Sequence, residues 1–188
     1  MQRLIGLLVG AVFGMLFVAI NAHEPLPSTA GILLRVAAGV ALAFVIFVYM
    51  VAGKLIKTGA VPQSGQAGGP MFGKAYLVIV GIEVVLLFGG LPVLGALGVP
   101  AQVNVAWIAF VVGAHFVALA PVWKAPSMLV PGVVPTVLGI AGFVMAGTSA
   151  IAWVPFVSGV LSGVTLLGAS AVLSWQQLAE LRKVAATS

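Results

Sequence analysis

The chain has 188 residues, of which 62% are hydrophobic and only 6% are charged. A soluble domain carries about 25% charged residues, so this composition excludes a chain whose surface mostly faces water. There is no cysteine, which excludes disulfides, thiolate catalysis and cysteine-based metal sites. The net charge is +5, but the basic residues flank apolar segments, a pattern typical of membrane anchoring. We therefore expect a lipid bilayer, and no nucleic acid, as the partner.

Six nearly uncharged apolar segments run through the chain. A helix rises about 1.5 Å per residue and needs about 20 apolar residues to cross a hydrocarbon core about 30 Å thick. Each segment is long enough, so the sequence predicts an all-α, polytopic membrane protein: six transmembrane helices in a single bundle, forming one domain over residues 1–188. The predicted spans are residues 4–20, 32–52, 75–97, 103–123, 128–147 and 151–173.

The basic residues predict the orientation of these spans. The three connections on the side opposite the N-terminus, residues 21–31, 98–102 and 148–150, contain no Lys or Arg. The N-terminal side collects seven, namely Arg3, Lys54, Lys57, Lys74, Lys124, Arg182 and Lys183. Under the positive-inside rule both termini lie in the cytoplasm. The abundance of Ala, Val, Gly and Pro is typical of GC-rich bacterial genomes, so we expect a bacterial inner (plasma) membrane.

The first span has a second interpretation, because Arg3, an apolar run and small residues near Ala22 also suit a secretory signal peptide. However, Gly6, Gly10 and Gly14 form a doubled GxxxG ridge, which lets another helix approach closely. A cleaved leader has no use for such a ridge. We therefore expect the segment to be retained as a transmembrane helix, with these glycines at helix contacts.

The longest connection, residues 53–73, is rich in glycine and proline and lacks apolar periodicity. It predicts a flexible cytoplasmic loop. Its Gly-rich run does not suit a phosphate-binding loop, because no Gly-Lys-Ser or Gly-Lys-Thr follows it. Beyond Trp175 we expect the last helix to continue out of the membrane.

Small and hydroxyl-bearing residues mark the sixth span. Gly159 and Gly163 offer small faces against which a neighbouring helix can pack. Ser158, Ser162 and Thr165 have two interpretations: their hydroxyls bond back to their own helix, or they form a polar stripe along a substrate or proton pathway.

Glu83 and His115 are the most informative polar residues within the predicted spans. Their midpoint in the sequence is residue 99, inside the tight turn of Gly98, Val99 and Pro100. An antiparallel hairpin therefore puts both side chains at one depth, where they can meet. A carboxylate in hydrocarbon is costly without a partner, and an ionisable residue in a span is treated as a functional candidate.

Three roles remain open for this pair. It can be a structural hydrogen bond that locks the third helix to the fourth, a proton relay or substrate site, or a metal site. Metal binding is the weakest interpretation, and two histidines at different depths do not suit haem. We expect no resident metal ion and no cofactor.

A second polar cluster is predicted on the outer side. It combines His23, Glu24, Arg35 and Asn104, with Gln102 nearby. Arg35 lies near the end of its span, where it can extend to the interface or pair with Glu24. Alternatively, the cluster binds an anionic group.

Three functions are compatible with these features. The first is a transporter or channel for a small solute, with a polar path through Glu83 and His115. The second is a membrane-embedded enzyme acting on a lipid or isoprenoid-like substrate, with Glu83 as the acid and His115 as its partner. The third is an accessory subunit that packs into a homo-oligomer or a larger membrane complex.

Overall fold

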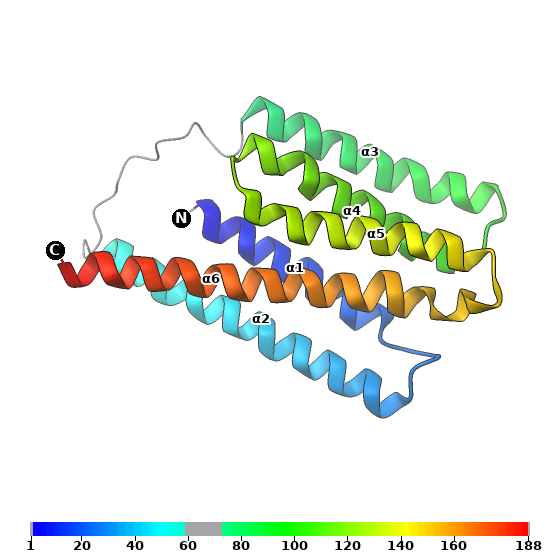
Figure 1. Cartoon of the computed structure of the whole chain (residues 1–188), viewed down its shortest axis with the longest axis horizontal. Coiled ribbons are helices and arrows are strands. Elements are labelled where there is room, and N and C mark those ends of the chain that lie inside the picture. Colours follow the sequence, from blue (N-terminus) through cyan, green and yellow to red (C-terminus); the bar gives the residue numbers. More distant parts are fainter. Residues whose placement is uncertain (1, 59–72, 188) are drawn as a thin grey trace.

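The computed structural model of the chain describes residues 2–58 and 73–187, and its regular elements in these ranges are all helical (Figure 1). The six α-helices are α1 (Gln2–Asn21), α2 (Ser28–Lys57), α3 (Lys74–Ala96), α4 (Gln102–Val122), α5 (Leu129–Ala146) and α6 (Leu161–Thr187). Two 3-10 helices, η1 (Pro126–Met128) and η2 (Ser149–Trp153), flank α5. A π-helix, η3 (Pro155–Val160), leads directly into α6.

Six of these helical segments are long and apolar enough to cross a membrane, which confirms the all-α prediction. The predicted spans match the helices closely except at both ends of α2. Residues 28–31, expected in a connection, form the first turn of this helix. Residues 53–57, expected in a loop, are the last turn of α2, and Thr58 caps that helix. The rest of the expected flexible loop, residues 59–72, lies outside the described residues. The last helix continues well past Trp175, as predicted.

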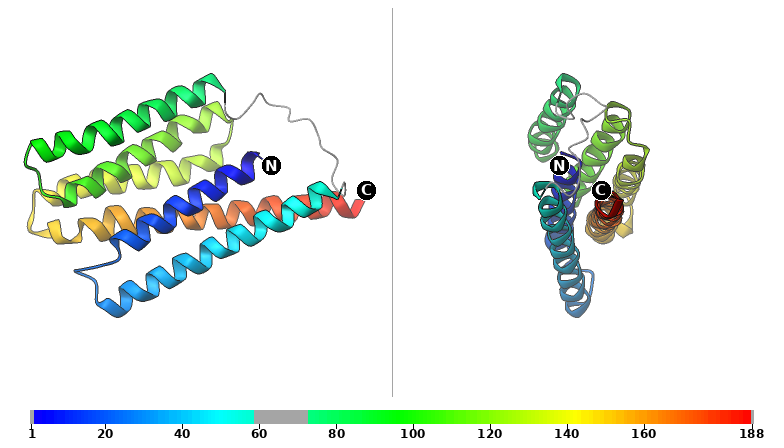
Figure 2. Two further views of the ribbon diagram at one scale, coloured as in Figure 1. Left: turned by 180° about the vertical axis from the view of Figure 1, so that it is seen from behind. Right: turned by 90° about the vertical axis from the view of Figure 1, so that its left-hand side faces the viewer.

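Both termini lie at one end of the helices, together with the ends that carry the basic residues (Figure 1). We call the opposite end, formed by residues 22–27, 97–101 and 147–153, the far end. Viewed end-on in Figure 2, α1 and α2 lie on one side and α5 and α6 on the other, while α3 lies at an edge. Helices α1, α2 and α6 pack together as one group, and α3 packs on α4, which packs on α5.

The core lies between the helices of the first group. Val18 of α1, Val45 of α2 and Leu167 of α6 belong to one buried cluster. A second cluster joins Phe17 of α1 to Val112 of α4, so it links the first group to the second.

Glycines set the distance between α1 and α6. A Cβ atom on Gly14 would lie 2.8 Å from the carbonyl oxygen of Gly163, and one on Gly10 would lie 3.0 Å from the Ser170 hydroxyl. Gly159 packs directly against the Asn21 side chain. These four glycines therefore lie at helix contacts, where a larger side chain has no room.

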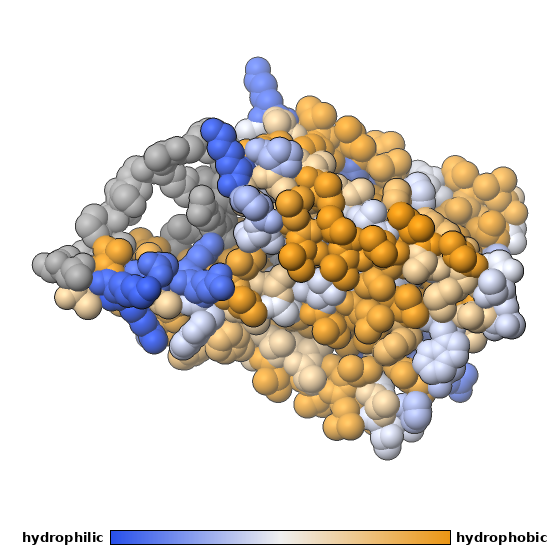
Figure 3. Space-filling view, in the orientation of Figure 1, coloured by the Kyte–Doolittle hydropathy of each residue, from blue (hydrophilic) through white to orange (hydrophobic). Residues whose placement is uncertain are grey.

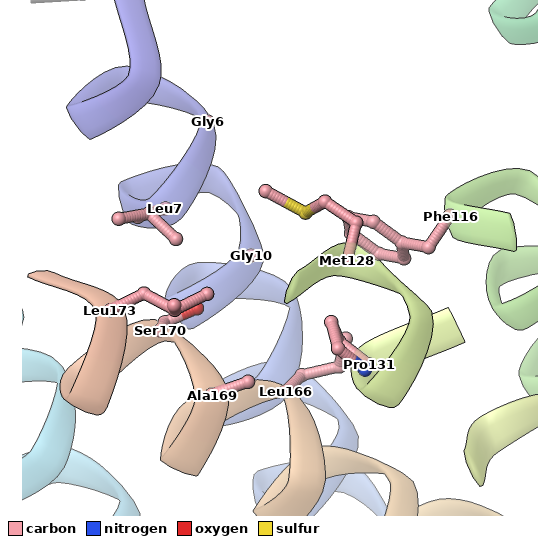
Figure 4. Close-up of a pocket in the computed structure, with 10 residues that line it drawn as sticks. All are labelled: Gly6, Leu7, Gly10, Phe116, Met128, Pro131, Leu166, Ala169, Ser170 and Leu173. Atoms are coloured by element: carbon pink, nitrogen blue, oxygen red, sulfur yellow. The ribbon is translucent and has the colours of Figure 1, made fainter. Parts of the chain in front are cut away.

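Gly6 is an exception to the prediction. A Cβ atom there would meet nothing within 4 Å. Gly6 instead borders a cavity of about 10 Å³, with Phe116 and Met128 across from it (Figure 4). This volume holds about one water molecule and no solute.

Helix α3 has no buried residue along its whole length. Its large apolar side chains, such as Val85 and Phe88, are mostly exposed. The surface over α3, α4 and α5 is broadly hydrophobic, and the most hydrophilic residues gather at the end that holds the termini (Figure 3). A surface of this kind suits hydrocarbon better than water.

Candidate functional site

The turn between α3 and α4 positions Glu83 opposite His115. Gly98 has a φ of +66°, a left-handed conformation that favours glycine and lets the chain reverse direction tightly. The two helices then run antiparallel, and Nδ1 of His115 lies 3.0 Å from Oε2 of Glu83. The two side chains meet, as the hairpin argument predicts.

The pair is largely, but not completely, covered by the protein. The side chains of His115 and Glu83 are 11% and 17% exposed, respectively. Nδ1 of His115 is buried and has no hydrogen-bond partner among the described residues. Oε2 of Glu83 is close enough to it, but the angle at the N–H group is unfavourable for a hydrogen bond. The contact therefore joins two titratable groups that can exchange a proton.

Aromatic side chains mark both sides of the pair along the α3–α4 contact. Toward the termini, Tyr76 stacks on Trp123 with 6.0 Å between ring centroids. Toward the far end, Nε1 of Trp107 donates a hydrogen bond to the carbonyl oxygen of Leu86 at 2.9 Å. A Cβ atom on Gly90 would lie 2.5 Å from that Nε1, so only glycine leaves room for the indole. Helix α3 is thus held to α4 by these side chains at three levels.

Among residues 2–58 and 73–187, no group of three or more His, Cys, Asp or Glu side chains could hold a metal ion. Glu83 and His115 together supply two ligands, fewer than a structural or catalytic zinc site uses. Proton exchange is the chemistry that this pair can perform with its own atoms.

The hydroxyl residues of the last helix do not border an open path. Ser158 and Ser162 are fully buried. The Ser158 hydroxyl donates across the interface to the carbonyl oxygen of Leu138 at 2.8 Å, and not to its own helix. Thr165 bonds back to Leu161 at 2.8 Å. Self-bonding to the same helix therefore describes Thr165. The role of the three residues in a substrate or proton pathway stays a prediction.

The outer cluster is only partly assembled. His23 and Glu24 line a hollow at the far end, together with Gln102. Arg35 does not pair with Glu24; its Nε donates instead to the carbonyl oxygen of Ala19 at 3.0 Å. Neither Arg35 nor Asn104 lines the hollow. The hollow therefore contains His23, Glu24 and Gln102 but not the predicted cation, and the anion site as composed stays a prediction.

Two polar contacts were missed by the sequence reasoning. The first is the hydrogen bond from the Trp107 indole to α3. A buried tryptophan usually finds a partner for its ring N–H, which is the signal that could have predicted this bond. Asn21 is buried at the end of α1, where its Nδ2 donates to the carbonyl oxygen of Phe17 at 2.8 Å. An amide at the end of an apolar run is a recognisable helix-end signal.

No protein-family model, curated protein or solved structure matches the chain. Its function is therefore argued from the contacts described above.

Proposed function

We propose that the chain is a carrier in a bacterial inner membrane that moves a small solute and exchanges a proton at Glu83 and His115. The supporting observation is the 3.0 Å contact of these side chains on α3, a helix with no buried residue. A titratable pair thus helps to attach α3, the helix that is least buried in the protein.

The proposed orientation puts both termini in the cytoplasm. Seven Lys and Arg residues flank the helix ends near the termini, and the three far-end connections have none. The exposed apolar surface of α3 then faces lipid, which explains why exposed Val85 and Phe88 need no protein partner.

Packing favours a carrier over an open channel. Ser158 and Ser162 are fully buried between helices, so this stripe leaves no space for a continuous file of water. Passage of a solute requires a helix to move. Helix α3 has no buried residue of its own, so its movement would expose no buried side chain that it carries.

The pair couples a proton to that movement through its charge. With one proton shared between them, carboxyl and imidazole attract each other, either as an ion pair or as a neutral hydrogen bond. A second proton makes an imidazolium beside a neutral carboxyl group, and the ionic attraction is lost. Acidification should therefore weaken the attachment of α3 to α4.

A proton-flux assay tests the proposal. The protein is reconstituted in vesicles that contain a pH-sensitive dye, and the dye reports proton entry when candidate solutes are added under a pH gradient. We expect solute-dependent proton entry with the native chain and none with Glu83→Gln, because the amide keeps the shape but cannot titrate.

Glu180→Gln is the matched control. Glu180 pairs with Lys183 at 2.9 Å on the exposed end of α6, so this change also removes one carboxylate. Proton entry should be unaffected in this variant. Equal flux through the native chain and the Glu83→Gln variant, with both proteins folded, would overturn the proposal.

A further inference from the structure

A hollow opens at the far end, away from the Glu83 and His115 pair. It has a volume of about 690 Å³ and lies between the α1–α2 connection, the start of α4 and the segment that precedes α6. Small-molecule sites commonly measure about 300–1,000 Å³, so this volume suits a small organic solute. Its lining residues are His23, Glu24, Pro25, Ala101, Gln102, Val105, Ala152 and Pro155.

The polar side of the hollow carries a free negative charge. Glu24 has no ion-pair or hydrogen-bond partner among the described residues. Among the described residues, the other charged side chain close to this end is Arg35 of α2, which donates to the Ala19 carbonyl oxygen and does not pair with Glu24. The Glu24 carboxylate is therefore not neutralised by the protein, and a cation is the ligand that it would attract.

The remaining lining decides between a metal ion and an organic cation. His23 and Glu24 are the only metal-ligating side chains of the usual kinds in the hollow, too few for a metal site. Pro25, Val105 and Pro155 supply an apolar wall instead. A few polar groups on a mostly apolar wall suit a ligand with one charged end and one hydrocarbon end.

The floor of the hollow is also unusual in its backbone. Pro155 is the first residue of η3, and π-helical segments within longer helices are frequent at functional sites. Here Gly159 of the π-helix packs against the Asn21 side chain at the end of α1. This contact joins the α1–α2 connection to the segment that precedes α6. The hollow is thus built on buried contacts and does not rest on loops alone.

We propose that this hollow binds a small primary alkylammonium ion. The ammonium group donates hydrogen bonds to the Glu24 carboxylate and to the Gln102 side-chain oxygen, and the alkyl group packs on Val105 and Pro155. That such an ion is the transported solute rests on the proposed carrier function, whereas its binding does not.

Binding of n-butylammonium to the full chain in a neutral detergent tests this inference, by ligand-observed NMR or calorimetry. The ion should bind, and 1-butanol, which has a similar size but no charge, should not compete. Glu24→Gln should weaken binding roughly ten- to hundredfold, since a hydrogen bond to a charged group is lost. Glu180→Gln, at the opposite end, should leave binding unchanged.

Three results would overturn the inference: no binding of n-butylammonium, equal binding by the Glu24→Gln variant, or displacement of the amine by millimolar Ca²⁺ as effectively as by another amine. The experiment is separable from the carrier proposal, because Glu83→Gln should keep amine binding while losing proton flux. Binding without flux leaves the hollow assigned and rejects the carrier. Solute-dependent flux without amine binding supports the carrier and rejects the assignment of the hollow.

Discussion

The contact between α1 and α6 differs in kind from the contact between α3 and α4. In the first, Gly14 faces Gly163 so closely that a Cβ atom would lie 2.8 Å from a carbonyl oxygen. In the second, side chains make the contact: the Glu83–His115 pair, the Tyr76–Trp123 stack and the Trp107 indole bonded to the Leu86 carbonyl oxygen. One helix contact is made by backbone packing, the other by a few polar and aromatic groups.

This difference separates stability from response. Close packing of backbones depends on shape and does not change with protonation. A contact made by a carboxyl group and an imidazole changes when either gains or loses a proton. The α1–α6 contact can therefore stay fixed while the α3–α4 contact responds to pH.

The largest effect is expected from Gly163→Leu. The new side chain would enter the space occupied by the Gly14 carbonyl oxygen and the side chains of Phe17 and Val18. Overpacking of this kind costs about 1–3 kcal/mol or more, and here backbone must move as well. Thermal unfolding in detergent should show a clearly lower midpoint. Gly168→Leu on the same helix, where nothing lies within 4 Å, is the control and should keep or slightly raise the midpoint.

The Glu83–His115 contact should give a smaller but coupled effect. Either single change, Glu83→Ala or His115→Ala, leaves its partner without a counterpart, at a cost of about 1–3 kcal/mol. The double variant should cost less than the two single losses added together. Hydrogen exchange of the α3 amides reports this free energy. Additive effects would show that the two side chains do not depend on each other.

Trp107→Phe should have a modest effect that is confined to α3. The ring stays, but the hydrogen bond to the Leu86 carbonyl is lost, a change of about 1 kcal/mol. Faster amide exchange in α3 with an unchanged rate in α1 and α6 is the expected pattern. Equal acceleration in all helices would mean that α3 is part of one cooperative unit.

The smallest effect is expected from Gly6→Ala, and it has the opposite sign. A Cβ atom at Gly6 meets nothing within 4 Å, so alanine should stabilise the helix by roughly 0.5–1 kcal/mol. The same change at Gly14 should destabilise the protein. If the thermal midpoints of both variants rise, or both fall, the distinction between Gly6 and Gly14 is contradicted.

Sequence alone predicted the features that depend on local chemistry. Apolar length gave the helices, and symmetry about the Gly98 turn gave the meeting of Glu83 and His115. It could not tell Gly6 from Gly14, because their different surroundings depend on the angle at which α1 crosses α6. Nor could it show that Arg35 bonds to the Ala19 carbonyl, since the Glu24 carboxylate is nearer to Arg35 in the sequence. The edge position of α3 is likewise a tertiary property.

The most direct test of the account measures whether α3 moves with protonation. The chain has no cysteine, so Val85→Cys on α3 and Val137→Cys on α5 accept spin labels without background. Both native side chains are exposed, at 69% and 55%. Labels at Ile20→Cys on α1 and Val137→Cys provide the control pair. Distances are measured in lipid at about pH 8 and about pH 5, a range in which histidine commonly titrates.

We expect the α3–α5 distance distribution to shift or broaden on acidification and the α1–α5 distribution to stay the same. Glu83→Gln should abolish the pH response. An α3–α5 distance that is the same at both pH values in the native chain would contradict the central claim that the Glu83–His115 pair controls the position of α3.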